Sequence, residues 1–280
     1  DGPQTHLKKN GTPTMGGVIF LLAVLITSLI YAPQYPKVIP VLFMTVGFGI
    51  VGFLDDFIKV VLHRSEGLTP GQKMAGQLVV TAVFAYYMVK ISDVGLTLKV
   101  PFFPNISLNP GWLSIPLLFF VVIGTVNGTN FTDGLDGLAA SVTVMVAVFF
   151  SVVALGTNAG IAPITLAVVG GLLGFLLFNV YPASVFMGDT GSLALGGFVA
   201  STAYMMNMPL FLLLVGIIYL VEVLSVMIQV TYFKVTHGKR FFKMAPIHHH
   251  FEKCGWSETR VVTVFSIITA LCCLVALAGI

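Results

Sequence analysis

Long apolar segments recur nine times along the chain, and this repetition restricts its fold more than any other feature of the sequence. Hydrophobic residues make up 57% of the 280 residues and charged residues only 9%, whereas a soluble domain carries roughly 25% charged residues. Each segment approaches the ~20 residues that a membrane-spanning helix needs and lacks the alternation of a transmembrane barrel strand. We therefore predict an all-α polytopic membrane protein with nine membrane helices. The segments are residues 14–32, 38–54, 74–91, 112–127, 138–156, 160–178, 191–207, 209–230 and 260–279.

If all nine segments span, the connections between them alternate between two sides of the membrane. The first side has eleven of the 14 lysine and arginine residues, counting Arg260 at its border, and all 6 histidines. Because basic residues concentrate in cytoplasmic loops, we predict that this side faces the cytoplasm. On the other side, the alternation from Val94 to Val100, followed by Pro101 and Pro104, predicts a small β-hairpin. The first side comprises residues 1–13, 55–73, 128–137, 179–190 and 231–259.

Two adjacent acids, Asp55 and Asp56, follow the second apolar segment. If the helix continues, Lys59 lies four residues after Asp55, so one interpretation is an exposed ion pair worth about 0.3–0.5 kcal/mol. The other is a general base or metal ligand beside a lysine that binds phosphate. Acids at a membrane edge are costly and usually functional, and an ion pair needs only one acid. Both considerations favour the second interpretation.

A second acidic pair, Asp133 and Asp136, lies between two apolar segments in NFTDGLDGLA. Asp133 could cap the following helix, but capping needs only one acid. The glycines Gly128, Gly134 and Gly137 favour an irregular loop whose backbone a ligand can approach closely. This stretch therefore predicts a substrate pocket.

A third acid, Asp189, precedes another apolar segment in a stretch that also contains Asn179, Phe186 and two flanking glycines. Capping of that segment is the simpler interpretation. The mixture of residues also suits a hard cation with oxygen ligands next to an aromatic surface for a flat base. Mg²⁺ in proteins typically uses one or two carboxylates together with substrate phosphates.

Three consecutive histidines, His248, His249 and His250, lie in the basic stretch 231–259. A purification tag is an alternative, although tags are usually terminal and longer. Consecutive histidines cannot readily chelate one ion on a helix, whereas they suit phosphate or sugar recognition. Glu222 lies within an apolar segment, so we expect it to face the bundle interior with a polar partner. Its distance from the cytoplasmic loops favours a structural role.

Five motifs of the chain resemble those of one enzyme family, and the resemblance runs through essentially the whole chain. They resemble the polyprenyl-phosphate N-acetylhexosamine-1-phosphate transferases, and the first and last motifs point to the phospho-N-acetylmuramoyl-pentapeptide transferase branch. That family has ten membrane helices, so the resemblance implies one more helix before Asp1. The motifs are DGPQTHLKKNGTPTMGG (1–17), Asp-Asp-x-x-Lys (55–59), NFTDGLDGLA (130–139), FNVYPASVFMGDTGS (178–192) and APIHHHFE (245–252).

The resemblance implies a multi-pass enzyme of the bacterial inner membrane that acts in peptidoglycan synthesis and has its active site facing the cytoplasm. Such an enzyme would transfer phospho-MurNAc-pentapeptide from UDP-MurNAc-pentapeptide to undecaprenyl phosphate, giving lipid I and UMP, with Mg²⁺ as cofactor. Phosphoryl transfer depends mainly on positioning and charge neutralisation, which a metal and lysines supply. The resemblance also implies a homodimer, inhibition by nucleoside compounds and no nucleic-acid partner. We expect residues 1–280 to form a single integral-membrane transferase domain.

The resemblance further implies roles for individual residues. Asp189 would bind Mg²⁺, and Asp55 and Asp56 would act at the lipid-phosphate end, with Asp55 the expected base. The expected substrate-binding residues are Phe186, Gly134, Leu135 and Asp136 for uridine, Asn130, Asp133 and Asn179 for the polar shell, Lys73 for phosphate, and Lys9, Thr14, Gln229, His248, His249 and His250 for the sugar and peptide.

Three other functions remain to be weighed. A sibling transferase that uses UDP-N-acetylglucosamine is the nearest alternative, and the APIHHHFE motif favours the pentapeptide branch. An ion-coupled transporter would place acids near the membrane midplane and often shows repeats, whereas here only Glu222 is central. An intramembrane aspartyl protease would carry Gly-x-Gly-Asp, and Phe186 stands at the first glycine position.

Overall fold

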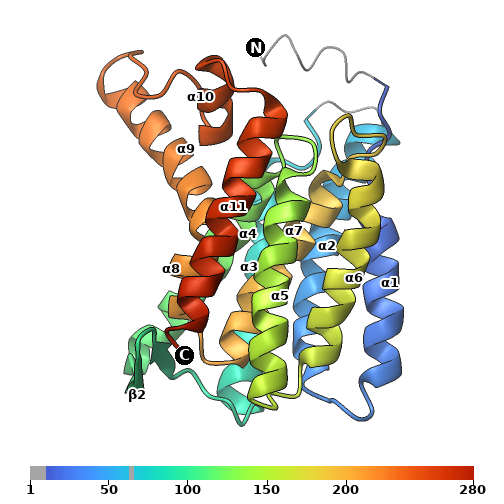
Figure 1. The fold of residues 1–280 in the computed structure, drawn as a ribbon, viewed down its shortest axis with the longest axis vertical. Helices are drawn as coiled ribbons and strands as arrows, with labels where there is room; N and C mark the ends of the chain where they lie inside the picture. The colour runs from blue at the N-terminus through green and yellow to red at the C-terminus, as the bar shows by residue number, and fades with distance from the viewer. Residues whose placement is uncertain (1–10, 63–65) are drawn as a thin grey trace.

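The computed structural model describes residues 11–62 and 66–280, and its long helices run up and down in one bundle (Figure 1). The helix α10 lies at one end of the bundle, and the strands and the C-terminus lie at the other, so we name them the α10 end and the hairpin end. The helices are α1 (Gly17–Tyr31), α2 (Val38–Val60), α3 (Pro70–Lys90), α4 (Ser114–Thr132), α5 (Leu138–Gly156), α6 (Ala162–Asn179), α7 (Gly188–Met205), α8 (Leu212–Val215), α9 (Ile217–Val235), α10 (Ile247–Lys253) and α11 (Glu258–Leu277).

Helices occupy all nine predicted segments, but the prediction of nine spanning helices is not confirmed. Within the described residues, 6 helices are long and apolar enough to cross a membrane: α2, α4 with its preceding turn, α5, α6, α9 and α11. The helix α1 has only 15 residues. The helix α7 is rich in glycine, serine and threonine, and its residues from Thr190 to Met205 are all buried. Because protein surrounds α7, it needs no apolar surface for lipid.

Glycines allow α7 to reach this central place. A Cβ on Gly52 of α2 would overlap the carbonyl group of Asp189, and a Cβ on Gly196 of α7 would lie 2.5 Å from the Cα of Val126 in α4. Only glycine permits such a close approach of two backbones. The approach at Gly52 brings the end of α2 against the start of α7, and this sets the position of the acidic residues.

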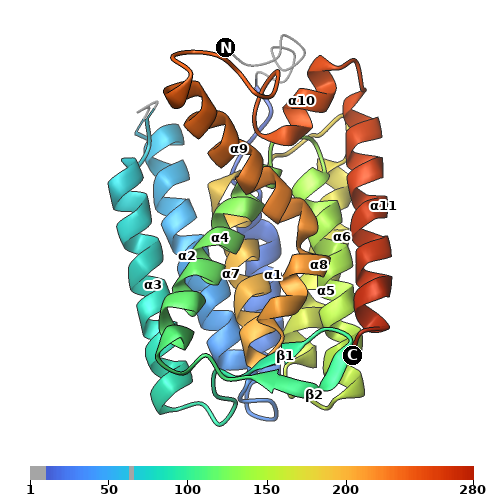
Figure 2. The ribbon, with the colours of Figure 1, turned by 90° about the vertical axis from the view of Figure 1, so that its left-hand side faces the viewer.

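The predicted segment 209–230 is divided rather than continuous. A 3-10 turn (Pro209–Phe211) and the short helix α8 precede Gly216, after which α9 begins. The helix α9 leans away from its neighbours toward the α10 end (Figures 1 and 2). Its buried residues, Ile218, Tyr219, Glu222 and Ser225, all lie in its first half, so the second half stands apart from the core.

The predicted hairpin is confirmed at the end opposite α10. Strand β1 (Leu98–Val100) pairs antiparallel with β2 (Phe103–Leu108). The backbone N–H of Lys99 donates to the carbonyl of Asn207 at 2.7 Å, and that of Phe102 donates to the carbonyl of Gly279 at 2.8 Å. These bonds join the hairpin to the ends of α7 and α11 (Figure 2).

Candidate active site

Three acids from two helices converge at the α10 end of the bundle. Ligand oxygens of Asp55, Asp56 and Asp189 all lie within 4.8 Å of one another. The first two acids come from the last turns of α2 and the third from the first turn of α7. Asp189 lies more than 130 positions after Asp55 and Asp56, so the contact between α2 and α7 at Gly52 is what brings the three acids together.

Two lysines lie between these carboxylates. The ammonium group of Lys59 is 2.5 Å from Oδ2 of Asp55 and 3.1 Å from Oδ2 of Asp189. Lys73, from the first turn of α3, lies 2.9 Å from the same Asp189 oxygen. The expected ion pair between Lys59 and Asp55 is therefore present, but it belongs to a larger charged cluster. A lysine ammonium group in this position can balance phosphate charge.

Asp56 is turned toward the backbone of α7. Its carboxylate accepts hydrogen bonds from the N–H groups of Asp189 and Thr190, at 3.2 and 2.8 Å, and from the Thr190 hydroxyl at 2.6 Å. The first N–H groups of a helix have no partner within the helix, and a carboxylate there also stabilises the helix dipole. Asp56 thereby fixes the turn that carries Asp189, while its predicted catalytic role remains a prediction.

Asn130 holds the other oxygen of Asp189. Its amide lies 2.8 Å both from Oδ1 of Asp189 and from the hydroxyl of Ser192. Asn130 was predicted only as part of the polar shell around the substrate, and that role remains a prediction, whereas Ser192 and Thr190 were missed. The signal for Ser192 was available, since it lies three residues after Asp189 and hence on the same face of a helix.

The donor set of this cluster fits a hard divalent cation. Carboxylate oxygens are the ligands that Mg²⁺ prefers. Burial, together with the charges of Asp189 and Asp56, raises the pKa of the Asp133 carboxyl well above its usual range. Asp55, Asp56 and Asp189 are the residues that would hold a cation at this cluster.

A second group of predicted residues lies in two neighbouring loops. Asp136 accepts a hydrogen bond from the N–H of Ala183 at 3.0 Å and so joins loop 133–137 to loop 180–187. The amide of Asn179 is buried and donates to the carbonyl of Val185 at 2.9 Å. Leu135 is also buried. These three side chains shape the loops, and the half-buried Phe186 follows them in loop 180–187.

The segment before α1 crosses the second of these loops. The N–H of Phe186 donates to the carbonyl of Pro13, and the N–H of Gly16 donates to the carbonyl of Phe186, both at 2.8 Å. A Cβ on Gly188 would lie 2.6 Å from Oδ2 of Asp56 and 3.1 Å from the hydroxyl of Thr14, so Thr14 lies beside the acidic cluster. Lys9 lies outside the described residues.

The three histidines point to three different partners. Nδ1 of His248 lies 3.0 Å from Glu222, and Nδ1 of His249 lies 2.7 Å from Glu252. His250 accepts a hydrogen bond from the N–H of Lys243 at 3.1 Å. Gln229 accepts hydrogen bonds from the N–H groups of Phe241 and Phe242 and thereby holds the connection before α10.

Glu222 has the expected polar partner, but the reason given for a structural role was wrong. The short helix α10 folds back against α9. His248 of α10 therefore reaches Glu222, which the sequence places inside an apolar segment. Hydropathy cannot reveal such a return of the chain.

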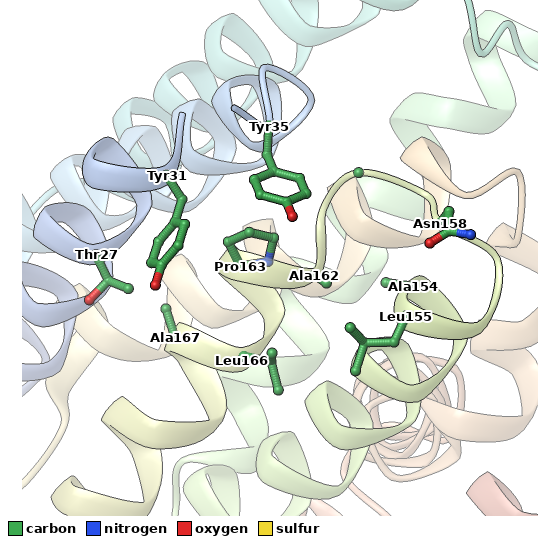
Figure 3. A pocket seen from close by; sticks show the side chains of 11 residues that line it. Thr27, Tyr31, Tyr35, Ala154, Leu155, Asn158, Ala162, Pro163, Leu166 and Ala167 are labelled. Carbon is green, nitrogen blue, oxygen red and sulfur yellow. The ribbon is translucent and has the colours of Figure 1, made fainter. Parts of the chain in front are cut away.

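A cavity of about 490 Å³ lies at the hairpin end, at the opposite end of the bundle from these residues. Figure 3 shows the side chains that line it. Its lining includes Tyr31 at the end of α1, Tyr35 in the following turn, Asn158 between α5 and α6, and Leu166 of α6. No lining residue is acidic or basic. The cavity lacks the groups that phosphoryl chemistry needs, so we place the candidate active site at the acidic cluster.

Comparison with known proteins places the chain in a family. The model of glycosyl transferase family 4 matches residues 38–207, and the phospho-N-acetylmuramoyl-pentapeptide-transferase signature 1 matches residues 9–21. A phospho-N-acetylmuramoyl-pentapeptide-transferase of Acetivibrio thermocellus is 54% identical over 279 residues, which is 98% of this chain and 83% of the relative. The protein of the same name from Clostridium perfringens strain 13 is 50% identical over 281 residues, 100% of this chain and 87% of the relative.

A more distant relative of the same name, from Caldicellulosiruptor bescii, is 47% identical over 279 residues, 99% of this chain and 86% of the relative. Identity at this level over nearly the whole chain confirms the predicted enzyme class. The multi-pass helical bundle with its acidic cluster belongs to the phospho-N-acetylmuramoyl-pentapeptide-transferases, a family of phosphoglycosyl transferases.

Proposed function

We propose that this protein carries out the Mg²⁺-dependent transfer of phospho-MurNAc-pentapeptide from UDP-MurNAc-pentapeptide to undecaprenyl phosphate. The products are lipid I and UMP, and residues 1–280 act as one membrane domain. The observation that best supports the proposal is the convergence of Asp55, Asp56 and Asp189 with Lys59 and Lys73. A cluster of acids and lysines at the end of a membrane bundle suits a reaction between a soluble diphosphate and a lipid phosphate.

In the proposed reaction an oxygen of the lipid phosphate attacks the phosphorus that carries the sugar. The bond from that phosphorus to the UMP oxygen breaks, and UMP leaves with the electron pair. Asp55 takes the proton from the lipid phosphate, and Lys59 and Lys73 balance the phosphate charges. Asn130 and the two lysines hold the Asp189 carboxylate in place. Mg²⁺, when bound at Asp189, would neutralise charge on the diphosphate.

Turnover of UDP-MurNAc-pentapeptide with undecaprenyl phosphate, with and without Mg²⁺, tests the proposal directly. We expect UMP release that requires both substrates and stops when Mg²⁺ is chelated. Replacing the donor by UDP-N-acetylglucosamine separates the proposed reaction from that of the sibling transferase. Equal or better turnover of the second donor would contradict the proposal.

Phe186→Ala should weaken the binding of uridine nucleotides. We propose that the half-buried ring of Phe186 stacks on uracil, and stacking on a base is worth about 1–3 kcal/mol, which corresponds to roughly 5- to 150-fold in affinity. Calorimetric titration of the detergent-solubilised protein with UMP measures the change. Phe186→Tyr, which keeps a ring, is the matched control. Unchanged affinity in Phe186→Ala would place the uracil elsewhere.

The α10 end should face the cytoplasm, because eight of the described basic residues lie there and three at the hairpin end. The exposed native Cys254, next to α10, provides a label for one side. A membrane-impermeant maleimide added to intact cells should leave Cys254 unmodified. The same reagent should modify the double variant that carries both Ser107→Cys and Cys254→Ser, because its new cysteine lies in the exposed strand β2. Efficient labelling of Cys254 from outside would reverse the proposed orientation.

The homodimer, the inner-membrane location and inhibition by nucleoside compounds remain proposals that follow from the family. A nucleoside inhibitor would compete with the UDP substrate for the loops around Phe186. Competition kinetics against UDP-MurNAc-pentapeptide would distinguish it from an inhibitor that blocks the lipid.

A further inference from the structure

Glu222 and His248 form a buried pair that the proposed chemistry does not use. Their side chains are 0% and 1% exposed, and Oε1 of Glu222 lies 3.0 Å from Nδ1 of His248. In the tautomer that carries its proton on Nδ1, the imidazole donates to the Glu222 carboxyl group. The contact joins α9 to α10 and turns the opposite edge of the imidazole ring away from Glu222.

That opposite edge faces the loop between α4 and α5. A Cβ placed on Gly134 would lie 2.6 Å from Cε1 of His248 and would overlap Nε2. The ring thus occupies the space in which another residue would carry its side chain. Nε2 is buried and has no hydrogen-bond partner within the described part of the chain. The imidazole is wedged between the Glu222 carboxylate and the Gly134 backbone.

Gly134 belongs to the loop that reaches the proposed nucleotide site. Two residues later, the Asp136 carboxylate accepts from Ala183 of loop 180–187, and the Asp136 N–H donates to Glu258 at 2.7 Å. A displacement at Gly134 would therefore be transmitted to the loop that carries Phe186. The packing of imidazole against backbone leaves little room for adjustment, because protein interiors are close-packed.

Glu222 lies where α9 begins to leave the bundle. One turn earlier, the hydroxyl of Tyr219 lies 2.8 Å from that of Thr143 in α5, and a Cβ on Gly128 of α4 would lie 2.6 Å from the carbonyl of Tyr219. The first half of α9 is thus fixed against α4 and α5. Glu222 extends this fixed region to α10 through its contact with His248.

We propose that Glu222, acting through His248, is a positioning residue that fixes loop 133–137 for the binding of a uridine nucleotide. The proposal rests on the proposed function. It also revises the role of His248, which, at 0% exposure, supports the loop instead of touching the sugar and peptide. Glu222 acts without contact to the reacting phosphates.

Two measurements on the full chain in detergent test this role. The first is hydrogen exchange of the loop 133–137 amides without ligand, and the second is UMP affinity by calorimetry. Glu222→Ala should speed exchange in this loop and weaken UMP binding about tenfold, the factor that corresponds to ~1.4 kcal/mol. Glu222→Gln keeps an oxygen that accepts from Nδ1, so it should stay within about threefold. Ser151→Ala, which removes a buried hydrogen bond within the half of α5 that is nearer the hairpin end, should leave both measurements unchanged.

A double-mutant cycle tests the packing of the His248 ring against the Gly134 backbone. Gly134→Ala should weaken UMP binding because the new methyl group meets the His248 ring, and adding His248→Ala should remove that clash. The two losses should therefore be less than additive. Strictly additive losses would overturn the proposal, as would unchanged loop exchange in Glu222→Ala or faster exchange in all helices. If the parent protein fails to bind UMP, the proposed function falls, and loop exchange still decides the positioning role.

Discussion

Asp189→Asn should abolish turnover while the protein remains folded. The carboxylate is the point at which Lys59, Lys73 and Asn130 meet, and the amide removes the charge that would hold Mg²⁺. Losing a ligand of a catalytic metal costs several kcal/mol of transition-state stabilisation, which is on the order of a 10³-fold loss in rate or more. Initial rates of UMP release over a range of Mg²⁺ concentrations measure the effect.

The matched control for this experiment is Asp93→Asn at the hairpin end. Asp93 is exposed, pairs with Lys37 at 3.1 Å, and its pKa is lowered by that lysine. The substitution makes the same chemical change far from the acidic cluster, so turnover should stay normal. Near-normal rates for Asp189→Asn at ordinary Mg²⁺ would remove Asp189 from the ligand role.

Asp55→Asn should lower the maximal rate severely while UMP affinity stays largely intact. Asp55 is 2% exposed, and its carboxylate is held by Lys59 and by the N–H of Leu68 at 2.7 Å. We expect it to remove a proton from the lipid phosphate, whose second pKa should lie near ~6 as in other phosphomonoesters. The defect should shrink as the pH rises, because the acceptor then ionises without a base. A pH–rate profile of the variant measures this.

A covalent mechanism predicts a different result. If Asp55 were a nucleophile, a higher pH would not rescue the variant, and a phospho-sugar adduct should form on the parent enzyme without the lipid. Mass spectrometry of the parent enzyme incubated with the UDP substrate alone detects such an adduct. An inactive variant at every pH, together with an adduct, would refute the role of Asp55 as a base.

Much of the candidate site could be predicted because an acidic residue is unusual at the edge of an apolar segment. Asp55, Asp133 and Asp189 all border apolar segments, and an acid there is costly unless it has a use. The helix-cap alternative for Asp133 is wrong, since the residue that precedes α5 is Gly137, in a left-handed conformation. Asp189 lies in the first turn of α7, but its carboxylate binds lysines and Asn130.

Other contacts had no signal in the sequence. The pairing of Glu222 with His248 depends on the return of α10 against α9. Asp55 and Asp56 make different contacts because their side chains point in different directions at the end of α2. Asp56 faces the start of α7, and Asp55 faces Lys59 and Leu68. Adjacent residues on a helix point in directions about 100° apart, so only the packing of α2 decides which one meets α7.

The sequence alone determined the membrane class, the approximate position of most long helices, the small hairpin and the family of this protein. It did so because hydropathy and local motifs depend only on residues close together in the chain. The tertiary structure decided that α7 is buried, that the segment before α9 is broken, and that acids more than 130 residues apart meet beside two lysines. These features depend on the close approach of backbones at glycines such as Gly52, and a linear pattern does not record which helices touch.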